Sequence, residues 1–417
     1  MIAFGLARQS ATDLRVTRIV ALGCGLLVAT AIACEVSSKG SKNGAGEGAN
    51  LPDGGTFRRA ELLEAFGTCA ERQAGAFVPA AQALETALAA AEANPDATTL
   101  AAAQQAWRTA IEAWSINEML QFGPGGPKSR AGGRDWRESI YSWPLGGRCS
   151  IEEKLVDKSY ENGLAGATVN VRGLLAIEYL LFYTGTDNAC TSSGAINADG
   201  SWAAIPADEL TRRKLAYARQ AATLVTQKAQ EIEAAWDPAA GNFLAEFTSA
   251  GKGSRTYQSD AIAFNVVSDS LFYLEYELKD IKLAHPMGLR DCANAVCPED
   301  VESSYAQHGK AQLRQNLVGA KLLLAGCGEN GSGLGFDDMF YALGQEPIAR
   351  DMVSGLDQAI AAADAIGNDD LSKAILEERD KVDALYNAVK SVTDRLKNDF
   401  VAVLDLEIPR RVEGDND

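Results

Sequence analysis

The stretch Thr168–Tyr183 reads TVNVRGLLAIEYLLFY and is apolar on nearly every side from Val169 to Phe182. A helix that is apolar all round is buried in the protein interior. One acid, Glu178, lies in the middle of this stretch. A buried carboxylate needs a cationic or hydrogen-bonding partner, or it stays protonated. We therefore predict a buried helix here, with Glu178 as its most informative polar residue.

Three roles for Glu178 are compatible with the sequence. It could be an oxygen ligand of a metal ion or a polar anchor for a bound molecule. It could also be a structural acid that pairs with a cation such as Arg172, six residues earlier, or with a cation from another helix. The sequence leaves these three roles open.

Composition favours an all-α protein that carries a strongly acidic surface. The chain has 417 residues, and its 39 Lys and Arg against 56 Asp and Glu give a net charge of −17. It is rich in alanine and has long stretches of Glu, Lys, Arg and Leu, which are good helix formers. Such acidity argues against nucleic acid or an anionic membrane surface as a partner.

The first residues are typical of an export signal. A basic segment precedes Ile19–Ala33, an apolar run too short for a comfortable membrane span. The sequence Ala31-Ile32-Ala33-Cys34 resembles a bacterial lipobox, which predicts a signal peptide over 1–33 and lipidation of Cys34. Residues 34–56 are rich in Gly, Ser and Asn and are predicted to be a flexible tether. We therefore expect a lipid-anchored protein of the cell envelope whose body faces the periplasm, with the outer membrane as the default.

Six cysteines follow Cys34 in the sequence, and they suit disulfide bonds in an oxidising compartment. Six cysteines allow fifteen pairings, of which we predict only Cys149–Cys190. There is no C-x-x-C motif, so neither a redox centre nor a zinc ribbon is supported. The six are Cys69, Cys149, Cys190, Cys292, Cys297 and Cys327.

Hydrophobic periodicity predicts helices along most of the remaining chain. The first is expected from Phe57 to about Asn94, broken in two at Pro79. A second begins at a cap formed by Asp96 or Thr98. Later helices are expected over 206–236, 242–250, 254–283, 299–325, 347–366 and 370–406.

The central stretch resembles the signature helix of the imelysin family, whose motif reads G-x-H-x-x-E. Gly173 and Glu178 match this motif, whereas Leu175 occupies the histidine position. Histidine and glutamate at i and i+3 share one helix face and could hold one metal together, but leucine cannot ligate a metal. Other segments resemble the family in the same order along the chain: Trp107–Pro124, Ile140–Pro144, His285–Gly288 and Ser303–Gly326.

The resemblance implies two packed four-helix-type bundles. A weak repeat of Asn170–Leu175 at Asn316–Lys321 is consistent with an internal duplication. We predict a first bundle over 57–250, a second over 251–410 and a polar tail over 411–417.

The resemblance also implies a ligand-binding cleft between the bundles. Candidate cleft residues are Glu178, Arg172, Glu118, Trp114 and Trp143, with Glu178 as the only candidate metal ligand. Each has an ordinary structural alternative: Glu118 could be an exposed helix acid, Trp114 a core residue and Trp143 a packed turn residue. No catalytic residue is assigned, because the chain has only two histidines and lacks H-E-x-x-H.

Members of the family are associated with iron uptake, so the implied ligand is iron, haem or a component of an uptake system. The leading expectation is a non-catalytic binding lipoprotein. A metal-dependent peptidase of the imelysin type is the alternative that Leu175 disfavours. A structural or partner-binding lipoprotein with a decayed cleft is the third.

Overall fold

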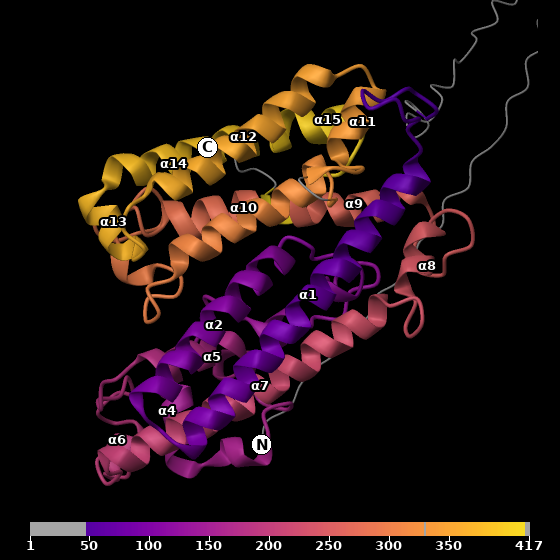
Figure 1. Ribbon diagram of the computed structural model, residues 1–417. Coiled ribbons are helices and arrows are strands. Elements are labelled where there is room, and N and C mark those ends of the chain that lie inside the picture. Colours follow the sequence, from indigo (N-terminus) through magenta and orange to yellow (C-terminus); the bar gives the residue numbers. More distant parts are fainter. Residues whose placement is uncertain (1–46, 329–330, 413–417) are drawn as a thin grey trace, which may run out of the picture. The chain divides into compact units, whose positions relative to one another are not determined.

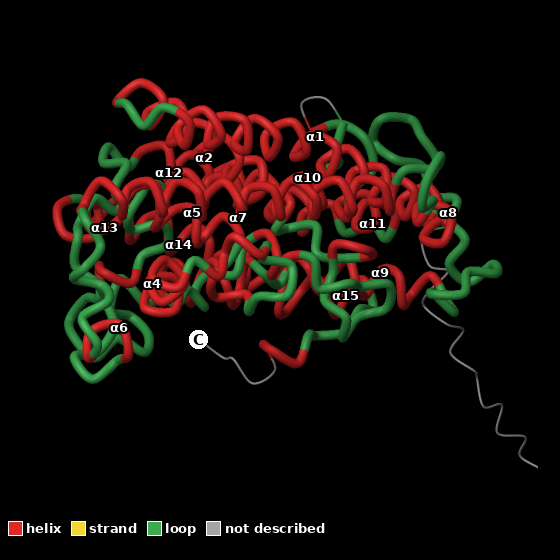
Figure 2. Tube along the Cα trace, turned by 90° about the horizontal axis from the view of Figure 1, so that it is seen from below, coloured by secondary structure: helices red, strands yellow, loops and turns green. Residues whose placement is uncertain are grey.

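The computed structural model describes residues 47–328 and 331–412. About 65% of the chain is helical, and the described residues form no strand (Figure 2), only an isolated bridge between Asn50 and Thr56. The all-α prediction is therefore confirmed. None of the helices in these ranges combines the length and apolar character that a membrane span needs.

The predicted signal peptide, Cys34 and residues 413–417 of the predicted tail lie outside the described residues. The end of the predicted tether does not. Gly48 N–H donates to the Phe57 carbonyl, and Leu51 is buried with Phe57 against the body. Residues from Gly48 onward thus belong to the folded unit, because two apolar side chains hold them there.

Four helices from the first half of the chain pack together, and we call them the first bundle: α1 (Arg59–Ala93), α2 (Ala97–Asn117), α5 (Gly173–Phe182) and α7 (Ala207–Trp236) (Figure 1). The Asp96 side chain accepts hydrogen bonds from Thr98 N–H and Thr99 N–H, so the predicted cap of α2 is confirmed as Asp96. Short helices line the connections: α3 (Arg137–Ile140), α4 (Arg148–Asp157), α6 (Ala195–Ala198) and α8 (Phe243–Thr248).

Pro79 does not break the first helix, contrary to the prediction. It is exposed inside a continuous α1. An internal proline costs a helix about 3 kcal/mol or more. Neighbouring Phe77, Val78, Ala81 and Leu84 are all buried, and their packing offsets this cost.

Four helical segments from the second half form the second bundle: the π-helix η5 (Leu274–Ala284), α10 (Gly309–Ala325), α12 (Glu346–Ala365) and α14 (Arg379–Arg395). Flanking it are α9 (Asp260–Leu271), α11 (Phe336–Ala342), α13 (Leu371–Glu377) and α15 (Val401–Leu404). The helix predicted from Glu299 begins only at Gly309. The preceding segment contains only the short 3-10 helix η6 (Pro298–Asp300). It does not continue as an α-helix because Glu302 and the Tyr305 and Ala306 amides bond to residues of the first half of the chain.

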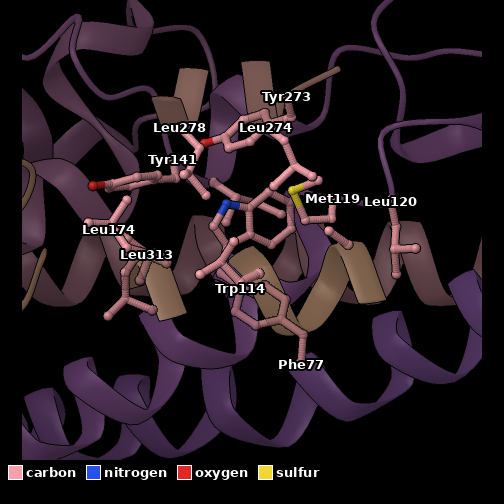
Figure 3. Packing of buried hydrophobic residues seen from close by; sticks show 14 of the residues in the cluster. Phe77, Trp114, Met119, Leu120, Tyr141, Leu174, Tyr273, Leu274, Leu278 and Leu313 are labelled. Carbon is pink, nitrogen blue, oxygen red and sulfur yellow. The ribbon is translucent and has the colours of Figure 1, made fainter. Parts of the chain in front are cut away.

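One continuous hydrophobic core joins the bundles through α2, which packs against α10. Trp114 of α2 lies against Phe77 of α1, with ring centroids 5.1 Å apart. Figure 3 shows this pair together with Leu274 and Leu278 of η5. The two halves of the chain therefore share one hydrophobic core.

Three disulfides are present, and the predicted Cys149–Cys190 bond is confirmed. Cys69–Cys327 joins α1 to the residues just after α10, across 258 positions of sequence, whereas Cys292–Cys297 closes a loop of only five. Chain entropy makes the longer cross-link the more stabilising one.

We expect the double variant Cys69→Ala/Cys327→Ala to lose about 3 kcal/mol more free energy of unfolding than Cys292→Ala/Cys297→Ala. Urea denaturation of both variants without reductant measures this difference. Equal losses would show that the bond between the two halves does not restrict the unfolded chain as loop entropy requires.

Candidate functional site

A cavity of about 720 Å³ lies between residues of the two halves of the chain. The first half contributes α5, the start of α4 and the turn at Trp143-Pro144. The second half contributes η5 and the segment from His285 to Tyr305. The resemblance led us to expect a cleft between the bundles, and this cavity lies between residues of the two halves; both Glu178 and Leu175 line it.

Helix α5 carries Glu178 into the cavity wall. The helix begins at Gly173, whose φ of 75° lies in the left-handed region. A Cβ at this position would lie 2.4 Å from the Ile140 carbonyl oxygen, so only glycine lets α5 begin this close to α3. Trp107 Nε1 donates to the Leu174 carbonyl at 2.9 Å and fixes the same turn from α2.

Glu178 holds the segment that precedes α10. Its Oε1 accepts hydrogen bonds from Tyr305 N–H and Ala306 N–H, both at 3.0 Å. The Ser303 side chain also interacts with this carboxyl group. Burial raises the pKa of Glu178 to about 7, although the two backbone amides act in the opposite direction. Among the three roles weighed above, the structure gives Glu178 backbone partners rather than a cation.

The raised pKa has a consequence for stability. The folded protein keeps a proton on Glu178 up to about pH 7, whereas the ordinary carboxyl has lost it above 4.5. The contribution of Glu178 to folding therefore falls as pH rises through this window, by on the order of 3 kcal/mol. We expect Glu178→Gln to become more stable relative to the parent protein by this amount between pH 4.5 and pH 8.

Denaturant unfolding at several pH values measures this change, with Glu377→Gln at an exposed position as the control. A difference between Glu178→Gln and the parent that does not vary with pH would show that Glu178 is ionised throughout.

Arg172 and Trp114 do not line the cavity. Arg172 donates to the Ala165 carbonyl at 2.8 Å and to Ser139 Oγ at 3.0 Å, so it stabilises the loop before α5 instead of pairing with Glu178. Trp114 is a core residue, as its structural alternative anticipated. Trp143 does line the cavity, half-buried.

Glu118 belongs to a cluster of charged and polar residues that is buried inside the protein. Its carboxylate lies 3.3 Å from both Lys282 of η5 and Arg137 of α3. Lys282 also contacts Glu302 at 2.9 Å and Asn316 of α10 at 2.9 Å. We call Glu118, Arg137, Lys282, Glu302 and Asn316 the buried cluster. Burial favours the neutral acid, but Lys282 and Arg137 outweigh it and lower the pKa of Glu118.

Sequence reasoning missed Lys282 and Glu302. Lys282 follows Glu275, Lys279 and Asp280, a charge pattern that is typical of a solvated helix. All these residues are buried in the structure. The weak repeat drew attention to Asn316 but contains neither Lys282 nor Glu302, so it gave no signal for them.

An aromatic group that the sequence did not identify forms another part of the wall. Tyr305 packs edge-on against Tyr179 and Tyr183, with centroids 5.4 and 5.6 Å away. The Arg148 guanidinium lies over the Tyr183 ring at 4.1 Å and pairs with Glu152 at 2.7 Å. This side of the cavity is rigid and its charges are already paired.

A metal ion would need several ligands close together. Within the described ranges, two groups of three candidate ligands have their atoms within 4.8 Å of one another: Cys149, Glu153 and Cys190, and His285, Cys297 and Asp300. Both include disulfide cysteines, whose sulfurs are not thiolates. Neither includes Glu178. With Leu175 beside it, Glu178 is a single oxygen donor, so the residues present do not fit a preformed iron site.

The imelysin family model matches residues 71–396. Two solved structures share the fold. An imelysin-like protein from Psychrobacter arcticum 273-4 has a TM-score of 0.60 at 16% identity, covering 84% of this chain and 98% of its own. A putative iron-regulated protein A precursor from Parabacteroides distasonis ATCC 8503 has a TM-score of 0.62 at 16% identity, covering 84% and 96%. No curated protein matches the sequence.

Proposed function

Because the chain belongs to the imelysin family, we propose that it is a non-catalytic binding protein of the cell envelope. Its ligand would be a small organic molecule or an iron complex held in the cavity between the two halves. The observation that carries this proposal is the cavity itself. Its volume of about 720 Å³ is within the range of small-molecule sites, roughly 300–1,000 Å³, and far exceeds that of a bare ion.

The character of the wall supports binding over catalysis. A metallopeptidase needs a metal with an open coordination position and a carboxylate base. Here the one buried carboxylate of the signature helix bonds to backbone amides, and Leu175 places an apolar side chain one turn before it. Such a surface suits an organic group.

The proposed location follows from other features. Three disulfides are typical of proteins that fold in an oxidising compartment. Lipidation at Cys34 would anchor the protein in a membrane, with the body in the periplasm. A link to iron or haem uptake is part of the proposal, since one structural neighbour is described as a putative iron-regulated protein.

The test is ligand-dependent thermal stabilisation of the purified protein by haem and by a ferric hydroxamate complex. We expect at least one of them to raise Tm, by roughly 3–4 °C at a hundred times its Kd. Ferrous and ferric ions alone should not. Leu175→Trp, which puts a larger side chain into the cavity, should abolish the shift, whereas Leu376→Trp at an exposed position of α13 should preserve it.

Two outcomes would contradict the proposal. A Tm shift that Leu175→Trp leaves intact would place the ligand elsewhere. No shift with any probe would favour a structural or partner-binding protein. Chelator-sensitive cleavage of unfolded casein by the pure protein would instead favour the peptidase.

A further inference from the structure

We propose that the ligand of this cavity is an organic cation, whose N–H group donates to Glu178 and whose apolar part lies against the aromatic wall. This inference rests on the proposed function and narrows its ligand class. Three independent features of the cavity carry it: the balance of charge, the buried polar groups at Glu178, and the exposed aromatic rings.

Acids outnumber bases around the cavity. Five carboxylates and two guanidinium groups line it. Both arginines are already engaged: Arg290 lies 2.6 Å from Asp280, and Arg148 pairs with Glu152 and Asp187. No described residue forms an ion pair with Glu299. An anionic ligand would therefore meet excess negative charge and no unengaged arginine, whereas a cation would be attracted.

The buried end of the cavity holds the Glu178 carboxyl group and the Ser303 hydroxyl. Glu178 is only 1% exposed, and its Oε1 accepts hydrogen bonds from two backbone amides. The Ser303 hydroxyl interacts with Glu178 and lowers its pKa, but it is buried without a well-aligned hydrogen-bond partner among the described residues. A buried polar atom without such a partner is costly, so this hydroxyl and the Glu178 carboxyl group beside it indicate where a polar group of a ligand would bind.

Aromatic faces lie at the same cavity. Tyr276 and Tyr305 are each 38% exposed, although large aromatic side chains are usually buried, and Trp143 is half-buried beside them. The negative face of an aromatic ring attracts a cation within about 6 Å. Together with Leu175 these rings would also cover the apolar part of the ligand.

The decisive experiment compares three indole compounds of nearly equal size: tryptamine, a cation; tryptophol, neutral; and indole-3-acetate, an anion. Calorimetric titration at pH 7.5 and physiological ionic strength should show tryptamine binding at least tenfold more tightly than either of the others. Glu178→Gln should abolish this preference. The substitution keeps an oxygen that can accept from Tyr305 and Ala306, so the segment before α10 is retained. Tyr305→Ala should weaken all three compounds and tryptamine the most, because the Tyr305 ring also attracts the cation.

Equal or tighter binding of indole-3-acetate or tryptophol, or no binding of tryptamine, would overturn the inference. Different results would contradict the proposed function. If haem or the ferric hydroxamate still raises Tm and Leu175→Trp abolishes the shift, the cavity binds a ligand that is not selected for positive charge. If neither raises Tm and no indole binds, both proposals are wrong.

Discussion

Replacing Lys282 by methionine should destabilise the protein by about 3–5 kcal/mol at pH 7, because breaking a buried ion pair leaves its acids uncompensated. Lys282 is 1% exposed and lies between Glu118 and Glu302, which are equally buried. Methionine keeps about the length of the side chain but removes the ammonium group, which also lies 5.2 Å from the centre of the Tyr273 ring. The loss therefore reports the charge and its hydrogen bonds, not a cavity.

The pH dependence of the free energy of unfolding of Lys282→Met shows whether the loss comes from the missing charge. Burial already holds the pKa of Glu302 above its ordinary value, whereas that of Glu118 is lowered. Without Lys282, the pKa of Glu302 should rise further, and that of Glu118 should rise above its value in the unfolded chain. Their ionisation then opposes folding, so the loss should grow as pH rises from 5 to 8. Urea denaturation measures it, and Lys321→Met, which removes an exposed pair with Asp357, should cost less than about 1 kcal/mol. A pH-independent loss would indicate a packing defect instead.

Gly173→Ala should cost a comparable amount, about 2–5 kcal/mol. A left-handed φ costs a residue with a Cβ roughly 1–2 kcal/mol, and overpacking typically adds 1–3 kcal/mol. The clash is with the Ile140 carbonyl, which is backbone and has little freedom to move.

Alanine substitutions at two nearby glycines distinguish the cost of the left-handed backbone from the cost of the steric clash. Gly163 has a φ of 84° with open space around its Cβ position, so Gly163→Ala should show only the backbone cost. Gly166 has open space and no positive φ, and Gly166→Ala should change the free energy of unfolding by about 0.5 kcal/mol at most. If all three variants are equally stable, the close approach of α5 to α3 does not constrain the fold.

The sequence was most informative where the composition of a segment shows that the segment is buried. The apolar run around Glu178 predicted a buried helix because nearly every residue in it avoids water, and Glu178 is indeed buried. The cap of α2 at Asp96 could be predicted because a helix cap depends on residues only three positions apart. The motif that contains Leu175 also led us to expect this helix, α5, at a cleft between the bundles.

The predictions failed where distant residues decide the structure. The start of α10 depends on Glu178 and Tyr141, which are more than 120 positions away and hold the preceding segment out of a helix. Lys282 looks solvated in sequence because its partners come from α2 and from the segment before α10. Only tertiary contacts distinguish such a lysine from a surface one.

The disulfide between Cys69 and Cys327 has a mechanical consequence. Many two-lobed binding proteins open and close about a hinge when a ligand enters or leaves. Here a covalent bond and the buried cluster both hold the halves together, which opposes such a movement. Entry and release would then depend on side chains at the cavity mouth, and the radius of gyration in solution should be the same with and without ligand. Residence time would be determined by the contacts themselves, with no domain-opening step to slow release.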